Sequence, residues 1–574
     1  MDKACWSFKI LIFANGESLS SPNQRDFSSF DPSTSQLRQS KKMGLLDVLK
    51  FSFVDMSGTA ATVTFVLILL ILLCWYSTSA FSELQKVGIR HPPPLPFIGN
   101  LLFFRKGFWE NHNKLINEYG PACGYYIGRR AFMVVSDPDM IQWILVEDFR
   151  SFTNRMAAPV TSKPLEDSIL ILRDERWKEV RSLLTPAFGA ANMKEMTPLI
   201  NQACDILLSH LKVYADSAAT FDIQRNYASF TLDVVASVAY GIHVDSPKNS
   251  RENFVKNSRR FFELAIFKPL LILTIAFPFI MIPLIRIFPN KKQKEVNGFF
   301  ISAIKNMIAL RDQQDTNERP RDFLQLMLDA RYPAIDTRME HFDTFSQGLE
   351  ESKTAANKGL PKKQPRTLTD DEIAGQAFLF LIAGYETTNS TLSFATYLLA
   401  TNPECQQKLL HEVDEFFAKH DVPDYQNIHE LLYLDMVIAE TLRMYPPAFR
   451  FTREASKDCV ILRQCIPAGF VVEIAVGHLH YNPKIWPEPE KFIPERFTAE
   501  AKQQRHPFSY LPFGAGPRGC IGVKLALMEI KLALLRILQK FSFQTCPETQ
   551  IPLQLKSQAT LGPKNGVYIK IAPR

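Results

Sequence analysis

The sequence has few of the features that mark a disulfide-rich secreted domain or a nucleic-acid-binding protein. Its nine cysteines are an odd number without paired spacing, which argues against a disulfide framework and for a reducing compartment. The formal net charge of +7 is mild. It gives no reason to expect a nucleic-acid partner, although anionic lipid or an acidic partner would suit it. No internal repeat is visible in the sequence. The length of 574 residues exceeds that of an average domain, although a single large α-rich catalytic domain is possible.

Long charge-free apolar runs are scarce too, and none before residue 50 is long enough for a signal peptide. Residues 1–42 are rich in Ser, Asn and Gln and are expected to form a disordered extension, with Met43 as an alternative start. Residues 59–76 carry no charge and would span ~27 Å as a helix, enough to cross a bilayer core. A buried core helix is the alternative. More basic residues closely follow this run than closely precede it, which predicts a single-pass anchor with the C-terminal body in the cytosol.

A proline-rich segment follows the anchor at residues 88–96. Consecutive prolines favour a stiff spacer, so we expect a hinge that orients the body, residues 97–574, against the anchor. A ligand for a proline-recognition module is the alternative. Alternating β-branched and aromatic residues predict strands at 124–128 and 132–135, and helical patterns dominate afterwards.

Two later regions differ from their surroundings. Residues 261–289 are mostly apolar but are interrupted by Pro269, Pro278 and Pro283, which makes a second membrane span improbable. We expect a partly immersed surface patch or the wall of a substrate-access route there, with ordinary core as the alternative. Residues 331–367 are polar and lack a sustained period, which predicts a solvated loop.

A long helix is predicted from the capping-box pattern at residues 369–372 as far as Asn402. About 31 residues would measure roughly 46 Å, enough to cross a domain. Gly384 and Thr387 are weak helix formers in its middle. A ligand packed closely over Ala383 and Gly384, with the Thr387 hydroxyl bonded to a carbonyl, would explain them. Plain helix–helix packing at a small residue explains them equally well.

The stretch from Phe513 to Gly522 places Cys520 after three glycines and a proline. An apolar segment with helical spacing, residues 521–541, begins directly after the cysteine. A sulfur at a helix N-terminus is favoured as thiolate, and glycines let the backbone approach a flat ligand. Such a sulfur can be an axial ligand of haem iron. A buried, inert cysteine at a turn is the alternative.

The full ten-residue pattern of this stretch, Phe-x-x-Gly-x-Arg-x-Cys-x-Gly, resembles the haem-binding loop of the cytochrome P-450 family. Three other motifs occur in the family's order: Trp177 with Arg181, the helical segment 383–388, and Glu440 with Arg443. The resemblance extends from the proline-rich segment to the end of the chain.

This resemblance implies a mainly α fold with a small β region, the P-450 fold, behind an N-terminal transmembrane helix. It implies one haem b with its iron ligated by Cys520. The residues expected to bind the haem, mostly at its propionates, are Arg155, Trp177, Arg181, Arg453, Phe513, Arg518 and Gly522. Those expected at the reaction centre are Cys520, Ala383, Gly384, Glu386 and Thr387. The resemblance also implies a buried structural network of Glu440, Arg443 and Arg496, and a segment, 156–169, that overhangs the haem.

Several long runs, among them residues 445–454 and 561–568, are similar to the branch of the family that isomerises the endoperoxide prostaglandin H2. Drug- and steroid-oxidising members share parts of these runs. The similarity implies prostaglandin H2 as substrate, a C17 hydroxy acid and malondialdehyde as side products, and a location in the endoplasmic reticulum membrane. No reductase is needed for this reaction, because the substrate supplies its own oxidised oxygen pair.

One feature fits that branch poorly. Glu386 and Thr387 form the acid–alcohol pair with which monooxygenating members deliver protons to dioxygen. We interpret the pair as an unselected remnant. The alternative is an NADPH-dependent monooxygenase of lipids, steroids or xenobiotics that is served by cytochrome P-450 reductase. A non-catalytic haem carrier or sensor is a third interpretation, but such a protein would not need a hydrophobic access region.

Overall fold

The computed structural model describes residues 58–574 except 157–160, 242–253, 255, 259, 262–268, 289, 315–321, 332–366 and 558. The predicted extension, residues 1–42, lies outside the described residues, as does nearly all of the loop predicted at 331–367. The chain divides into two compact units at Ile71–Leu72, inside helix α2 (Gly58–Thr78). The second unit, Leu72–Arg574, contains all the other described elements.

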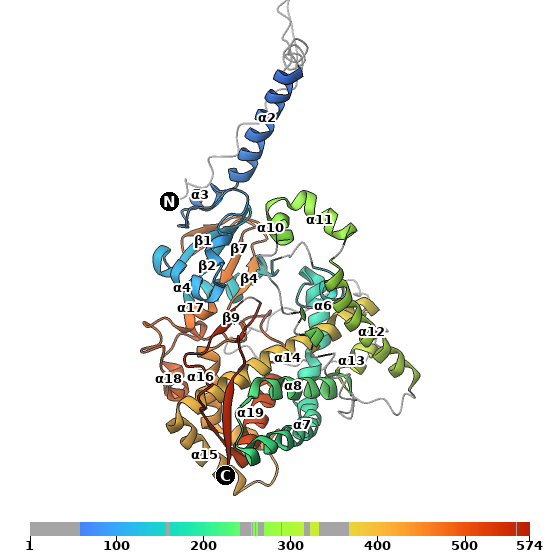
Figure 1. The fold of residues 1–574 in the computed structure, drawn as a ribbon, viewed down its shortest axis with the longest axis vertical. Coiled ribbons are helices and arrows are strands. Elements are labelled where there is room, and N and C mark those ends of the chain that lie inside the picture. The colour runs from blue at the N-terminus through green and yellow to red at the C-terminus, as the bar shows by residue number, and fades with distance from the viewer. Residues whose placement is uncertain are drawn as a thin grey trace, which may run out of the picture. The chain divides into compact units, whose positions relative to one another are not determined.

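Helices dominate the second unit, as predicted (Figure 1). Its α-helices are α3 (Glu83–Lys86), α4 (Phe108–Tyr119), α5 (Pro138–Gln142), α6 (Asp174–Leu184), α7 (Ala190–Ser217), α8 (Ile223–Tyr240), α10 (Pro269–Ala276), α11 (Pro278–Ile287), α12 (Lys291–Gln313), α13 (Phe323–Asp329), α14 (Asp370–Thr401), α15 (Pro403–Phe417), α16 (Leu432–Met444), α17 (Val476–His480), α18 (Ala499–Gln503) and α19 (Val523–Lys540). The short turns of 3-10 or π helix are η1 (Leu101–Phe104), η2 (Trp143–Glu147), η3 (Phe149–Phe152), η4 (Leu165–Asp167), η5 (Thr185–Phe188), η6 (Asn427–Glu430), η7 (Pro494–Phe497) and η8 (Pro507–Ser509).

The β region is small, as expected, and is split into separate sheets. Its strands are β1 (Ala122–Ile127), β2 (Arg130–Val135), β3 (Phe221–Asp222), β4 (Phe451–Glu454), β5 (Cys459–Ile461), β6 (Gln464–Ile466), β7 (Val471–Ile474), β8 (Phe541–Gln544), β9 (Leu555–Ser557), β10 (Leu561–Pro563) and β11 (Tyr568–Pro573). The largest sheet has the order β1-β2-β7-β4, in which β2 and β7 are parallel and the other pairs antiparallel. Strands β1 and β2 confirm the predictions at 124–128 and 132–135.

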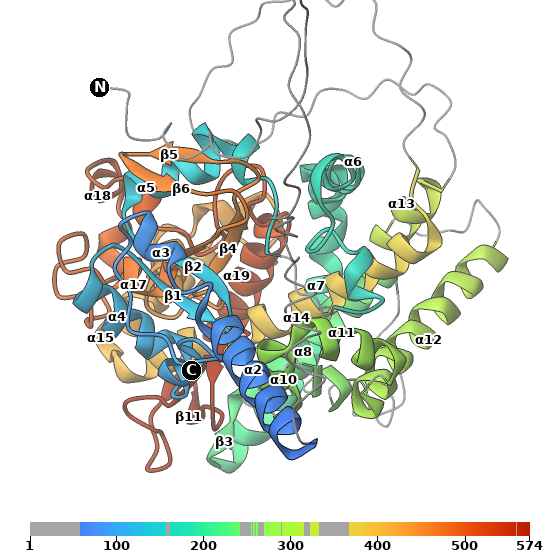
Figure 2. The same ribbon diagram turned by 90° about the horizontal axis from the view of Figure 1, so that it is seen from above.

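Helix α14 crosses the second unit and contacts α8, α12, α16 and α19 (Figure 1). It begins with the predicted capping box. The Thr369 hydroxyl accepts from the Glu372 N–H at 3.2 Å, and the Glu372 carboxylate accepts from the Thr369 N–H at 2.9 Å. Its C-terminal half is buried on every face, as expected for a helix at the centre of a large domain. In the view of Figure 2, strands β1, β2, β5 and β6 lie on one side of the unit, and α6 to α13 on the other.

Among the described residues, α2 is the one helix that is long and apolar enough to cross a membrane, and it covers the predicted span 59–76. It carries no charged residue, so the chain fits a single-pass membrane anchor. The Tyr76 hydroxyl, near the end of this helix, donates to the Ala276 carbonyl of α10 at 3.2 Å. The guanidinium group of Arg129 lies 4.2 Å from the centre of the Tyr76 ring.

The described part of the apolar region 261–289 forms α10 and α11, whose boundaries follow the prolines. Pro269 begins α10 and Pro278 begins α11, positions where a missing N–H costs nothing. Both helices are far shorter than a membrane span. Large apolar side chains on α11 and just after it face outward, with Phe279 79% and Phe288 72% exposed.

Candidate active site

Cys520 lies in the predicted loop, three residues before Val523, the first residue of α19. Gly522 is the N-cap of α19, so the helix begins slightly later than the apolar pattern suggested. The Cys520 N–H donates to the Phe513 carbonyl at 2.9 Å and closes the loop. Gly516 has a φ of +70°, and a Cβ there would lie 2.1 Å from the Leu145 carbonyl oxygen. Only glycine fits this turn without a rearrangement.

The loop does not by itself make Cys520 a thiolate. Cys520 is exposed because it opens onto the cavity, yet desolvation by the surrounding protein still raises the pKa of its thiol above the ordinary value. The Gly522 N–H and the guanidinium groups of Arg181 and Arg155 lower the pKa but do not outweigh burial. The Gly522 N–H at the start of α19 thus favours the thiolate, but desolvation by the surrounding protein outweighs it. A coordinating metal cation deprotonates a thiol outright, so the thiolate belongs to the metal-bound protein.

The middle of α14 forms the opposite wall of the cavity onto which Cys520 opens. Ala383, Gly384 and Thr387 line this cavity together with Cys520. The Thr387 hydroxyl donates to the Ala383 carbonyl at 2.7 Å, which is the predicted bond, and the helix continues unbroken. A Cβ on Gly384 would lie 2.8 Å from Val235 on α8. Helix–helix packing therefore requires a small residue here as well.

Glu386 does not line this cavity. Its carboxylate forms an ion pair with Lys556, at 2.6 Å, and its side chain is 5% exposed. The two residues border a separate, polar cavity that also contains Asn389 and Asp222. The structure thus separates the acid–alcohol pair: the Thr387 hydroxyl borders the cavity that Cys520 shares, and the Glu386 carboxylate lies beside Lys556.

The cavity between Cys520 and α14 has a volume of about 260 Å³. Much of the wall is apolar, with Val234, Val235, Val238, Ala239, Leu379 and Phe380 among the lining residues. The single carboxyl group among the described lining residues is Glu529, which the sequence analysis missed. Burial raises its pKa well above the ordinary value.

The predicted cofactor arginines gather at one end of this cavity. Arg155, Arg181 and Arg518 line it together with Trp177. The guanidinium group of Arg518 lies over the Trp177 ring, 4.1 Å from its centre. Arg453 is 1% exposed and close enough to Arg155 and Arg518 for their charges to affect its pKa, although it does not line the cavity itself.

Among the described residues, none of these four guanidinium groups forms an ion pair with a carboxylate, although Asp174 is near enough to Arg518 to raise its pKa. The Nε atoms of Arg155 and Arg453 have no hydrogen-bond partner there. Burial, followed by the neighbouring guanidinium groups, lowers the pKa of Arg518 to about 9 and that of Arg453 well below its usual range. Uncompensated buried charges are costly. The cluster therefore fits a ligand that brings two carboxylates, as the propionates of haem do, and the guanidinium fork suits carboxylates.

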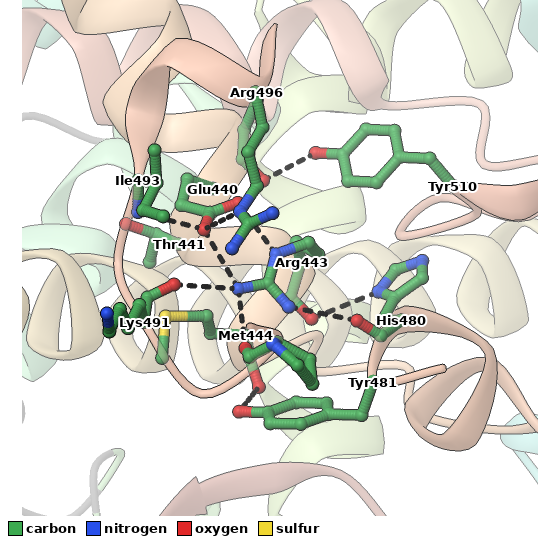
Figure 3. Close-up of polar contacts among 12 residues, drawn as sticks. Glu440, Thr441, Arg443, Met444, His480, Tyr481, Lys491, Ile493, Arg496 and Tyr510 are labelled. Carbon is green, nitrogen blue, oxygen red and sulfur yellow. Dashed lines mark hydrogen bonds and ion pairs between the residues drawn. The ribbon is translucent and has the colours of Figure 1, made fainter. Parts of the chain in front are cut away.

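The predicted network of Glu440, Arg443 and Arg496 is present and buried (Figure 3). Arg443 donates from Nε and Nη2 to the two Glu440 oxygens at 2.7 and 2.8 Å. Arg496 Nε lies 3.3 Å from Glu440 Oε1. Arg443 also donates to the carbonyls of His480 and Pro489, both at 2.9 Å. None of the three predicted residues lines the cavity, so the network ties α16 to the chain after β7.

A second buried polar cluster, around Glu473 on β7, was missed by the sequence analysis. Glu473 accepts from the Tyr125 hydroxyl at 3.0 Å and lies 2.7 Å from His112 Nε2 and 2.5 Å from Arg450 Nη1. Burial alone would raise the pKa of Glu473, but Arg450 and His112 outweigh it and lower the pKa to about 2. The sequence feature that could have indicated this cluster is a single carboxylate, Glu473, in the otherwise apolar strand Val471–Ile474. The cluster braces β4, the next strand in the sheet, which carries one of the four buried arginines.

Residues 89–571 match the family model described as cytochrome P450. The chain therefore belongs to the cytochrome P450 family. Family membership also gives the cofactor, a haem whose iron takes an axial thiolate, and the unpaired arginines and the cysteine loop described above fit that group.

The relatives include proteins named thromboxane-A synthase. The one from Macaca fascicularis is 59% identical over 536 residues, which cover 92% of this chain and 100% of that protein. The one from Sus scrofa is 58% identical over 534 residues, covering 92% and 100%. Cytochrome P450 3A29 of Sus scrofa is more distant, at 39% identity over 531 residues that cover 91% of this chain and 98% of that protein.

Proposed function

We propose that this chain is a haem-thiolate isomerase that converts prostaglandin H2 to thromboxane A2, with a C17 hydroxy acid and malondialdehyde as side products. Relatives named thromboxane-A synthase are 59% and 58% identical over nearly the whole chain, against 39% for a cytochrome P450 3A protein. The structural observation that carries the proposal is the mostly apolar cavity between Cys520 and α14.

In this proposal Cys520 would supply the thiolate that ligates the iron. Arg155, Arg181, Arg453 and Arg518 neutralise the propionates, and Trp177 adds its indole N–H. When bound, the thiolate-ligated iron supplies electron density that favours O–O cleavage, here of the endoperoxide. The Phe513 carbonyl and Gly522 hold the loop in place through the Cys520 N–H and the start of α19.

The remaining residues of the cavity exclude water and confine the substrate. Isomerisation leaves the atom count and the proton count of prostaglandin H2 unchanged, so no residue has to deliver a proton from solvent. This agrees with the position of Glu386 outside the cavity. Apolar side chains such as Val238 and Phe380 would keep water away from the substrate while its O–O bond is broken.

A second function is favoured by one observation, because the Thr387 hydroxyl does border the cavity. A monooxygenase of lipids, steroids or xenobiotics would use that hydroxyl together with Glu386. It would need dioxygen, NADPH and cytochrome P-450 reductase as a partner. The Glu386 carboxylate would then have to leave Lys556 or act through it.

A location at the membrane suits the proposed reaction, because prostaglandin H2 is a lipid. We place the chain in the endoplasmic reticulum membrane, anchored by α2 and with its catalytic body in the cytosol. The proline-rich segment 88–96 lies in no α-helix and would act as the hinge. The exposed apolar side chains of α11, such as Phe279, would dip into lipid beside the access route.

The test is to incubate the purified holoprotein with prostaglandin H2 without NADPH or reductase. We expect thromboxane B2, the hydrolysis product of thromboxane A2, together with the C17 acid. Absence of both, combined with NADPH-dependent hydroxylation of other lipids, would overturn the proposal. Thr387→Ala should leave kcat nearly unchanged, and a large loss would mean that the hydroxyl takes part.

A further inference from the structure

The segment from Thr161 to Leu172 supplies part of the wall of the Cys520 cavity. Its residues Ile169 and Leu170 line that cavity. Apart from the single turn η4 (Leu165–Asp167), the segment belongs to no helix or strand. Its position therefore depends on hydrogen bonds from other elements rather than on a regular backbone ladder.

Gln376 on α14 supplies two of these bonds. Its side chain is completely buried. Its Oε1 accepts from the Ile169 N–H at 2.7 Å, and its Nε2 donates to the Asp167 carbonyl at 2.8 Å. Nε2 also donates to the Glu372 carbonyl, one turn back along α14, at 3.0 Å. Both bonds to the segment go to main-chain atoms, so they fix its backbone directly.

Ile169 is bonded to both walls of the cavity. Its N–H goes to Gln376 on α14, and its carbonyl accepts from Arg518 Nη1, in the cysteine loop, at 3.3 Å. Arg518 Nη2 also donates to the Leu172 carbonyl at 2.8 Å. The segment is thus a bridge between the helix on one side of the cavity and the loop of Cys520 on the other.

The segment is also seated closely on α14. A Cβ on Gly375, the neighbour of Gln376, would lie 2.9 Å from both the Asp167 carbonyl carbon and the Pro164 oxygen. From α12, Asn297 Nδ2 donates to the Lys163 carbonyl at 2.9 Å. This part of α14 and the segment are therefore in close contact. Loss of the Gln376 bonds is expected to displace the Ile169 backbone.

We propose that Gln376 is a positioning residue that sets the depth of the substrate cavity through Ile169 and Leu170. It lies seven residues before Ala383, about 10 Å along the helix, and does not line the cavity. Gln376 therefore acts through the segment rather than on the substrate. With the segment held in place, the substrate has little freedom to move in the cavity, and this favours ring closure over fragmentation. The effect on product ratio rests on the proposed function, whereas the effect on the segment does not.

Gln406 on α15 is a matched control. It too is buried. Its Oε1 accepts from the Phe543 N–H at 2.7 Å, and its Nε2 donates to the Phe543 carbonyl at 3.0 Å and to the Leu399 carbonyl at 3.3 Å. Its bonds hold β8 rather than the cavity wall. Leucine at either position removes three main-chain bonds, so an effect that arises from lost stability alone would appear in both variants.

The experiment compares wild-type holoprotein with Gln376→Leu and Gln406→Leu in three measurements. These are hydrogen exchange in residues 165–172, the affinity for a stable epoxymethano analogue of prostaglandin H2 from the Soret shift, and the ratio of thromboxane B2 to C17 acid. In Gln376→Leu alone we expect faster exchange, affinity weaker by about 10-fold, and a ratio shifted toward the C17 acid, because small misplacements of a cavity wall cost catalysis heavily.

The proposal is overturned if Gln376→Leu matches Gln406→Leu in all three measurements. If Gln376→Leu does not fold, Gln376→Asn and Gln406→Asn replace the pair, since asparagine is too short to reach both main-chain partners. The same contrast then supports the proposal, and equal behaviour refutes it. If the wild type forms neither product, the proposed function fails, and exchange in residues 165–172 still decides whether Gln376 holds the segment.

Discussion

Replacing Arg155 by leucine should have opposite effects on the haem-free and the haem-bound protein. Arg155 Nε has no partner among the described residues, and Nη2 makes one long bond, 3.4 Å, to the Arg518 carbonyl. Burial, with Arg181 acting in the same direction and Cys520 against it, lowers the pKa of Arg155 from 12.5 to about 10. One pKa unit corresponds to about 1.4 kcal/mol, so the charge destabilises the haem-free fold by roughly 3 kcal/mol.

The sign follows from the direction of this change in pKa. At pH 7 Arg155 is protonated in both the folded and the unfolded chain, so the destabilisation is fully present, and it is relieved only as the pH rises above about 10. Leucine removes the charge at every pH. We therefore expect the free energy of unfolding of the haem-free protein to rise by up to ~3 kcal/mol. In the holoprotein a propionate loses its partner, so the haem should leave faster.

The assays are urea denaturation of the haem-free protein and the rate of haem transfer to apomyoglobin. Arg176→Leu is the control, because Arg176 Nε donates to the Glu372 carboxylate at 2.6 Å and does not line the cavity. That variant should lose stability and keep its haem-transfer rate. If Arg155→Leu instead lowers haem-free stability and leaves haem transfer unchanged, protein groups rather than propionates satisfy this guanidinium.

Three further predictions concern stability. Glu440→Ala leaves the buried Arg443 guanidinium unpaired and should lower the free energy of unfolding in urea by about 3–5 kcal/mol; a loss typical of surface pairs, under about 1 kcal/mol, would contradict this. Leu462 and Arg463, the β5–β6 turn, have φ of 46° and 70°, so Arg463→Gly should raise the free energy of unfolding by about 1 kcal/mol, and no gain would argue against strain. Glu473, with a pKa of about 2, contributes stability that is present above its ordinary pKa of 4.5 and lost as the pH falls toward 2. Glu473→Gln should flatten that dependence in acid denaturation, and an unchanged curve would refute the assignment.

Features that a short stretch of sequence determines were predicted correctly. The loop of Cys520 is specified by glycines that permit a positive φ, and the start of α14 by a capping box that spans four residues. The arginine cluster could be assembled only by resemblance. Its members come from parts of the chain separated by hundreds of residues, and nothing local to Arg155 or Arg453 indicates that they meet.

Features that depend on tertiary surroundings were not predictable. Much of α14 is buried on every side, so no amphipathic pattern in the sequence shows which face of the helix lines the cavity. For the same reason the ion pair of Glu386 with Lys556 could not be predicted. The local helix dipole favours a Cys520 thiolate, but burial, which the sequence does not report, outweighs it. Gln376 resembles any glutamine in an apolar helix, because its partner Ile169 lies 207 residues away in sequence.

The central claim is that this fold presents Cys520 as a thiolate ligand to haem iron. The most direct measurement is the Soret spectrum of the reduced holoprotein with carbon monoxide. The account predicts the red-shifted band that is characteristic of thiolate ligation, and loss of that band in Cys520→Ser. A wild-type band at the position seen in histidine-ligated haem proteins would contradict it.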